Sequence, residues 1–221
     1  MPSLPLFPLG AALLPGARLP LHLFEPRYLD LARRLSALDD DERRFGVVLI
    51  RKGHEVGVDS VRALYGIGCE ARVDAMVLAE GVNGTVVHLI ATGVRRFRLD
   101  GLDEAADTSF ATGLVTWLPE PALDPSPGVV ELADRAVREH TSYLTALGVE
   151  GAPVEAPLSQ VAYRVAEQMV LDPCDRQRVL EGGDPATRLR TVLGLLRRER
   201  AIVDRFGALP TPPAPGGASL N

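Results

Sequence analysis

The side chains that most often carry out chemistry are scattered in this sequence. His22, His54, His88 and His140 stand apart, without an H-E-x-x-H motif or a cysteine at the spacing of a metal ligand. None of the serines lies in a G-x-S-x-G turn, and a Ser-Lys dyad or a phosphate-binding P-loop would have to use the single lysine, Lys52. The segment around Lys52 has the polar composition of a turn. We therefore predict no catalytic residues, no cofactor and no metal site.

One cluster combines basic and aromatic side chains, at Arg95-Arg96-Phe97-Arg98. Arg95, Arg96 and Arg98 could contact RNA through phosphate contacts and stacking. Alternatively, the arginines are solvated on an edge strand around a core phenylalanine, since charges at sheet edges prevent aggregation. The acidic balance of this half of the chain favours the second interpretation, so we expect nucleic acid to be an unlikely partner.

The composition is that of a soluble globular protein. The chain has 221 residues, of which 46% are hydrophobic and 24% charged, with a formal net charge of −5. Early prolines interrupt the N-terminus before an apolar run long enough for a signal peptide forms, and no stretch approaches the length of a membrane span. We therefore predict a cytoplasmic protein in which Cys69 and Cys174 are reduced.

The elements that would position these residues begin with a β-rich half. Residues 66–80 alternate as a strand does, with a predicted buried face formed by Ile67, Cys69, Ala71, Val73, Ala75 and Val77. Asn83-Gly84 suits a hairpin turn that leads into a second long strand over 86–99. Further strands are predicted at 19–23, 45–50 and 110–117, a spacing that indicates a small barrel or sandwich.

A single helix interrupts this half. Pro26 suits the first helical position, Glu25 lies beside the positive end of the helix dipole, and the apolar residues recur on one face. That face consists of Tyr28, Leu31, Ala32, Leu35 and Leu38.

The second half of the chain is predicted to be helical. Residues 119–127 are proline-rich, and beyond them apolar residues recur at helical spacing in four segments. Ser126 is expected to cap the first of these helices, and Asp172 and Asp184, each followed by proline, the third and fourth. The expected organisation is a β-rich subdomain at 1–118, a linker at 119–127, a four-helix bundle at 128–206 and a disordered tail at 207–221.

The assembled pattern closely resembles the N-terminal substrate-binding domain of the ATP-dependent protease Lon, a family that includes cereblon-like proteins and stand-alone bacterial versions. The residues that carry the resemblance are Leu4-Pro5-Leu6-Phe7-Pro8-Leu9, Leu14-Pro15-Gly16, 19–28 (LPLHLFEPRY), 45–48 (FGVV), 93–98 (GVRRFR), 161–166 (VAYRVA) and 176–181 (RQRVLE). The resemblance implies an α+β fold, with a PUA-like β pseudo-barrel that contains one helix, followed by the helical bundle.

The resemblance also implies a recognition module for unfolded or tagged polypeptide segments. We expect a non-enzymatic adaptor or substrate-recognition factor in protein quality control, because no ATPase or Ser-Lys protease domain is found after Arg205. The segment would bind to apolar surface between the two subdomains or add a strand to a barrel edge. The partner could include a separate protease or chaperone, and we expect a monomer or weak homo-oligomer.

Four residues are the candidates for partner binding: Arg27, Tyr28, Arg96 and Phe97. Two roles compete for the Glu25-Pro26-Arg27-Tyr28 signature. In the structural role, which we favour, Glu25 and Pro26 start the helix, Tyr28 packs on the barrel and Arg27 pairs with an acid near the junction of the subdomains. In the functional role, Arg27 and Tyr28 lie on a groove that receives a peptide.

Overall fold

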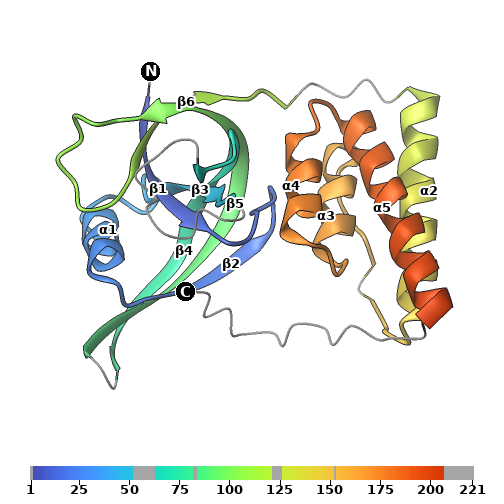
Figure 1. Cartoon of the computed structure of the whole chain (residues 1–221), viewed down its shortest axis with the longest axis horizontal. Coiled ribbons are helices and arrows are strands. Elements are labelled where there is room, and N and C mark those ends of the chain that lie inside the picture. The colour runs from blue at the N-terminus through green and yellow to red at the C-terminus, as the bar shows by residue number, and fades with distance from the viewer. Residues whose placement is uncertain (1, 52–62, 82–83, 121–125, 152, 207–221) are drawn as a thin grey trace. The chain divides into compact units, whose positions relative to one another are not determined.

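The computed structural model describes residues 2–51, 63–81, 84–120, 126–151 and 153–206 (Figure 1). These residues divide into two units between Pro119 and Glu120. Unit 1 contains a mixed sheet and one α-helix, and unit 2 is helical, so the predicted α+β class is confirmed. The tail predicted at 207–221, Lys52 and the turn residue Asn83 lie outside the described residues.

The sheet of unit 1 has six strands in the order β2-β5-β4-β3-β1-β6. Their bounds are β1 Ser3–Leu9, β2 Arg18–Leu23, β3 Arg44–Leu49, β4 Ile67–Gly81, β5 Gly84–Leu102 and β6 Thr112–Trp117. β1 runs parallel to β3, the other pairs are antiparallel, and β6 pairs with both β1 and β5. The predicted long hairpin and the three shorter predicted strands are all present.

The first strand, β1, was not expected from the sequence. Pro5 and Pro8 lack the N–H that a central strand uses, and proline is normally confined to sheet edges. β1 nevertheless lies between β3 and β6, and the backbone N–H of Leu6, between the prolines, donates to the Ala111 carbonyl at 2.8 Å. Leu6 is fully buried, so the apolar side chains between the prolines hold the strand in place.

Phe97 fills the centre of the core of unit 1. It is fully buried, and its ring lies against two glycines of neighbouring strands, Gly46 and Gly68. A Cβ atom at Gly46 would lie 2.8 Å from Cζ of Phe97, and one at Gly68 would meet the same ring and lie 2.7 Å from the Val47 carbonyl oxygen. The residues packed around Phe97 are Leu4, Leu6, Val48, Leu64, Leu99 and Val115.

The alternation predicted for β4 holds only as far as Val73. The pairing with β5 shifts register between Val73 and Ala75, so Asp74 lies in a bulge. Beyond the bulge the predicted buried face is wrong, because Val77 is 61% exposed and its neighbour Leu78 71% exposed. Because neighbouring residues of a strand point to opposite faces, both faces of β4 are open here, which an alternating pattern cannot reveal.

The predicted helix of unit 1 is α1, Pro26–Ser36. Pro26 occupies the first turn, and Glu25 is the N-cap residue, although its side chain makes no capping hydrogen bond. Tyr28, Leu31, Ala32 and Leu35 are buried as predicted, whereas Leu38 follows the helix and is exposed.

The described residues of unit 2 form four α-helices and a short 3-10 helix. They are α2 Pro127–Ala146, η2 Leu158–Gln160, α3 Val161–Glu167, α4 Pro173–Glu181 and α5 Pro185–Phe206, and α5 packs against α2, α3 and α4. Asp172 and Asp184 cap α4 and α5 as predicted, accepting hydrogen bonds from the N–H groups of Cys174 (2.8 Å) and Thr187 (2.9 Å). The predicted side-chain cap by Ser126 is wrong, because only its carbonyl bonds to the first turn of α2.

Buried polar groups lie inside unit 2. Arg188 is fully buried, and its guanidinium contacts a Glu120 carboxylate oxygen at 2.6 Å and the Tyr163 ring at 4.7 Å. His140 is 1% exposed, and burial lowers its pKa from the usual 6.5. No described helix is long and apolar enough to cross a membrane.

The contact of Phe97 with the glycines leads to a first prediction. Gly68→Ala places a methyl group against the ring and against backbone, so it should lower the free energy of unfolding by about 2 kcal/mol or more, measured by urea denaturation. Gly66→Ala is the matched control, because a Cβ there has nothing within 4 Å and should change stability by less than about 0.5 kcal/mol. Equal urea midpoints for the two variants would contradict this packing.

The burial of His140 leads to a second prediction. Because its pKa is lower in the folded than in the unfolded chain, its contribution to stability is present above about pH 6.5 and is lost as the pH falls below that value. The free energy of unfolding should therefore fall between pH 7.5 and 5.5, measured by urea denaturation at each pH. In His140→Leu the fall should be smaller, and an undiminished fall would show that other groups cause it.

Candidate functional site

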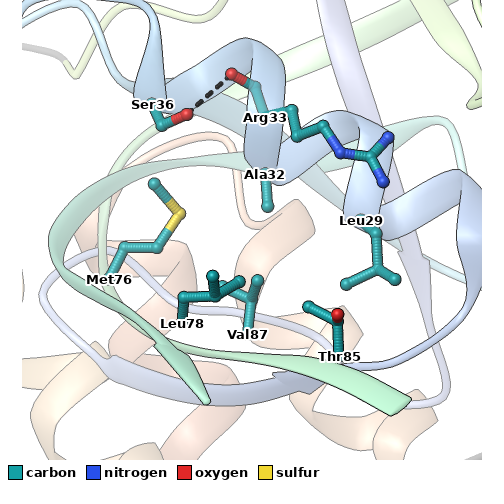
Figure 2. A pocket seen from close by; sticks show the side chains of 8 residues that line it. All are labelled: Leu29, Ala32, Arg33, Ser36, Met76, Leu78, Thr85 and Val87. Atoms are coloured by element: carbon teal, nitrogen blue, oxygen red, sulfur yellow. Dashed lines mark hydrogen bonds between the residues drawn. The ribbon is translucent and has the colours of Figure 1, made fainter. Parts of the chain in front are cut away.

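An open groove of about 490 Å³ lies in unit 1 beside α1 (Figure 2). Helix α1 forms one wall and the half of the β4–β5 hairpin nearest its turn forms the other. We call this hollow the α1 groove. Its lining residues are Leu29, Ala32, Arg33 and Ser36 from α1, and Met76, Leu78, Thr85 and Val87 from the hairpin.

Helical and strand spacing together explain this lining. Ala32 and Arg33 follow Leu29 by three and four positions, so both lie on the same face of α1 as Leu29. On the hairpin, Leu78 pairs with Val87, and Met76 lies two residues before Leu78 on the same face of β4. The bulge at Asp74 sets this phase, because it decides which residues beyond it point toward the helix.

The polar side chains that α1 contributes to the groove bond within α1 itself, and the hairpin adds one polar side chain, Thr85. Arg33 forms an ion pair with Asp30, and the Ser36 hydroxyl donates to the Arg33 carbonyl oxygen at 2.8 Å (Figure 2). The hairpin side presents Met76, Leu78 and Val87, which are apolar. The groove therefore offers apolar surface to a partner, with one arginine at its rim.

The outer edge of β4 is open beside the α1 groove. β3 pairs with β4 from Cys69 to Arg72, and the Arg43 carbonyl accepts one further bond from the Val73 N–H at 2.9 Å. From Asp74 to Gly81, β5 is the only described strand that pairs with β4. Helix α1 packs against β2 and β5. β2 pairs with β5 as far as Val87, opposite Leu78, and beyond that point β4 and β5 run on past the rest of the sheet (Figure 1).

Two of the predicted partner-binding residues line a second, smaller groove of about 260 Å³. Arg27 and Tyr28 form part of its wall, together with residues 102–112 between β5 and β6. Arg27 pairs with Glu25 at 2.7 Å and lies 4.6 Å from the centre of the Tyr28 ring. Tyr28 packs 4.3 Å from the ring of Phe7, and burial raises its pKa above the usual 10. The structural role predicted for Tyr28 therefore agrees with its packing, and the ion pair of Arg27 is with its own helix start.

The other two predicted residues are buried in β5. Arg96 is 2% exposed and Phe97 is fully buried, with the Trp117 ring 6.2 Å from that of Phe97. Neither residue lines the groove that holds Arg27 and Tyr28. Their burial gives them packing roles, and partner binding by the four residues stays a prediction.

The arginines considered for RNA contact have acidic partners or are buried. Arg95 bonds to Glu70 at 2.7 Å and lies 3.7 Å above the Trp117 ring, and Arg98 bonds to Asp100 at 2.7 Å. Arg96, which lies between Arg95 and Arg98 in the sequence, is buried. These three residues therefore form no open positive stripe. The predicted core position of Phe97 is confirmed, but the predicted solvated edge strand is wrong, because β5 lies between β2 and β4 and Arg96 is buried.

The groups capable of catalysis lie apart in the described residues. The rings of His88 and His22 meet edge to face, with their centres 4.6 Å apart. Cys69 is buried, with its Sγ 3.5 Å from the Glu70 carbonyl oxygen. No described group of three or more histidine, cysteine or acidic side chains could hold a metal ion.

The sequence contained an unused signal for the α1 groove. Five consecutive apolar residues, 75–79 (AMVLA), occupy both faces of β4, whereas a strand with one solvated face carries polar residues at alternate positions. The helix side of the groove gave no signal, because α1 meets β5 only in the folded chain.

Comparison with known proteins places this architecture in a family. Residues 3–198 match the family model for the substrate-binding domain of ATP-dependent protease La (LON). A Lon N-terminal domain protein from Xanthomonas campestris is 31% identical, with a TM-score of 0.62 over 88% of this chain and 98% of that one. The N-terminal domain of the Mycobacterium avium complex Lon protease has the same fold at 14% identity, with a TM-score of 0.62 over 89% of this chain and 98% of that one.

No curated protein matches the chain. The family model covers both units, from β1 to α5, and it covers the α1 groove in full. On this match, the chain belongs to the Lon substrate-binding domain family.

Proposed function

We propose that this chain is a non-catalytic recognition module that binds unfolded or tagged polypeptide segments, and that the α1 groove receives them. Membership of the Lon substrate-binding domain family supports a substrate-recognition role. The observation that carries the choice of site is the exposure of Leu78, at 71%, on the wall of the groove. A large apolar side chain so exposed beside a hollow marks an interaction surface.

The energetic argument rests on apolar surface that a partner would cover. Among the exposed large hydrophobic side chains described, Val77 and Leu78 have the highest exposed fractions. Fully burying such a side chain contributes about 1.5–3 kcal/mol, and every 1.4 kcal/mol changes affinity about tenfold. Covering Leu78 and the other apolar residues of the groove lining therefore suffices for weak, reversible binding, which suits a module that releases its substrates.

The same proposal includes the detailed architecture of the two units and the cellular role of the protein. We infer a PUA-like pseudo-barrel in unit 1, supported by the pairing of β6 with both β1 and β5, and a four-helix bundle in unit 2, supported by the packing of α5 on the other three helices. An adaptor role with a separate protease or chaperone, a place in protein quality control, a cytoplasmic location and a monomeric or weakly oligomeric state stay predictions.

The third prediction tests the groove. Leu78→Thr introduces a β-branched side chain, which strands favour, and removes most of the apolar surface. It should therefore weaken binding of fluorescein-labelled, carboxymethylated lactalbumin, which stays unfolded, by roughly tenfold. Fluorescence anisotropy would measure the dissociation constant. The free energy of unfolding should change by less than about 0.5 kcal/mol, because the residue is exposed.

Ile202→Thr is the matched control, since Ile202 is a 43% exposed apolar residue of α5 in unit 2. It should leave the dissociation constant unchanged. Equal affinities of Leu78→Thr and the unaltered protein would rule out the α1 groove as the site. The absence of saturable binding by the unaltered protein would overturn the proposed function itself.

A further inference from the structure

We propose that the bound polypeptide adds as a β-strand to the open edge of β4 between Asp74 and Gly81, an inference that rests on the proposed recognition role. In an antiparallel pair, the residues of a strand alternately direct their N–H and C=O groups toward their partner and away from it. Over this stretch only β5 pairs with β4 among the described strands. Alternate residues of β4 therefore present unpaired backbone donors and acceptors.

This edge lacks the usual protection against strand addition. Proteins commonly guard an exposed edge with lysine, proline or charged side chains along it. Residues 75–79 contain none of these, and the acidic residues Asp74 and Glu80 lie at the ends of the stretch. The Asp74 carboxylate is already bonded to Thr92 at 2.5 Å and Arg72 at 3.1 Å. An approaching strand would thus meet five consecutive residues without charge.

Both faces of the added strand would meet apolar side chains. Met76 and Leu78 line the α1 groove, so side chains on one face of the added strand would extend its apolar wall. On the opposite face, Val77 is 61% exposed, and its pairing partner on β5 is His88. We expect the larger side chains of the added strand on the groove side, where the hollow of the α1 groove lies.

The chemistry of the edge defines the class of ligand. It is an extended segment of about five residues, free of proline, with large apolar side chains at alternate positions and uncharged ones between. Such segments form the central strands of folded proteins and are accessible only when those proteins unfold. Backbone hydrogen bonds give affinity that is largely independent of sequence, and the groove adds a preference for apolar residues.

The test separates backbone pairing from binding by side chains alone. The probe is a fluorescein-labelled nonapeptide with the centre Leu-Thr-Leu-Thr-Leu and Ser-Gln flanks, because unequal faces prevent a one-residue slip in register. Two further peptides carry N-methyl groups, one on the three leucines and the other on the two threonines. In an added strand, only one of these two sets of N–H groups faces β4.

Strand addition predicts that one N-methylated peptide loses affinity by about tenfold or more while the other stays within about threefold of the parent, by fluorescence anisotropy with the full-length protein. Equal affinities for all three peptides, or an equal loss for both methylated ones, would overturn strand addition. In either case, binding of the parent peptide would still support the proposed recognition role. Failure of the parent peptide and of carboxymethylated lactalbumin to bind would overturn both proposals.

Discussion

The fit of the Phe97 ring against two glycines holds together the part of the sheet on which the candidate site depends. Gly46 on β3 and Gly68 on β4 leave space that the ring fills, so three strands meet closely at the base of the long hairpin. A two-stranded ribbon alone is marginally stable in water. Because its base is packed in this way, the β4–β5 hairpin can continue past β3 with an unpaired edge.

Local signals in the sequence predicted the elements that depend on neighbouring residues. Pro26 and the helical stripe gave α1, and the alternation after Gly66 gave the strand that became β4. β1 was missed because Pro5 and Pro8 argue against a central strand, although the residues between them can still bond. The buried face beyond Asp74 was predicted incorrectly because Val77 and Leu78, on opposite faces of β4, are both exposed. Which part of a strand its neighbours cover depends on the partner elements and not on the alternation itself.

The candidate site was harder to predict than the fold because it joins distant segments. The motif that includes Arg27 and Tyr28 drew attention to the start of α1, and these two residues do line a groove. The α1 groove, however, combines α1 with a hairpin about forty residues further along the chain. The burial of Arg188 beside Glu120 was likewise not predictable, because it follows from packing within unit 2 and not from the spacing of apolar residues along the helices.

The open edge of β4 connects these observations, because it is where an anchored hairpin, an uncharged stretch and an apolar groove coincide. Amide hydrogen exchange of the full-length protein, resolved by residue with and without saturating Leu-Thr-Leu-Thr-Leu-centred nonapeptide, tests this most directly. Strand addition predicts slower exchange at alternate amides between Asp74 and Gly81. Saturated binding that leaves the exchange of these amides unchanged would contradict the account.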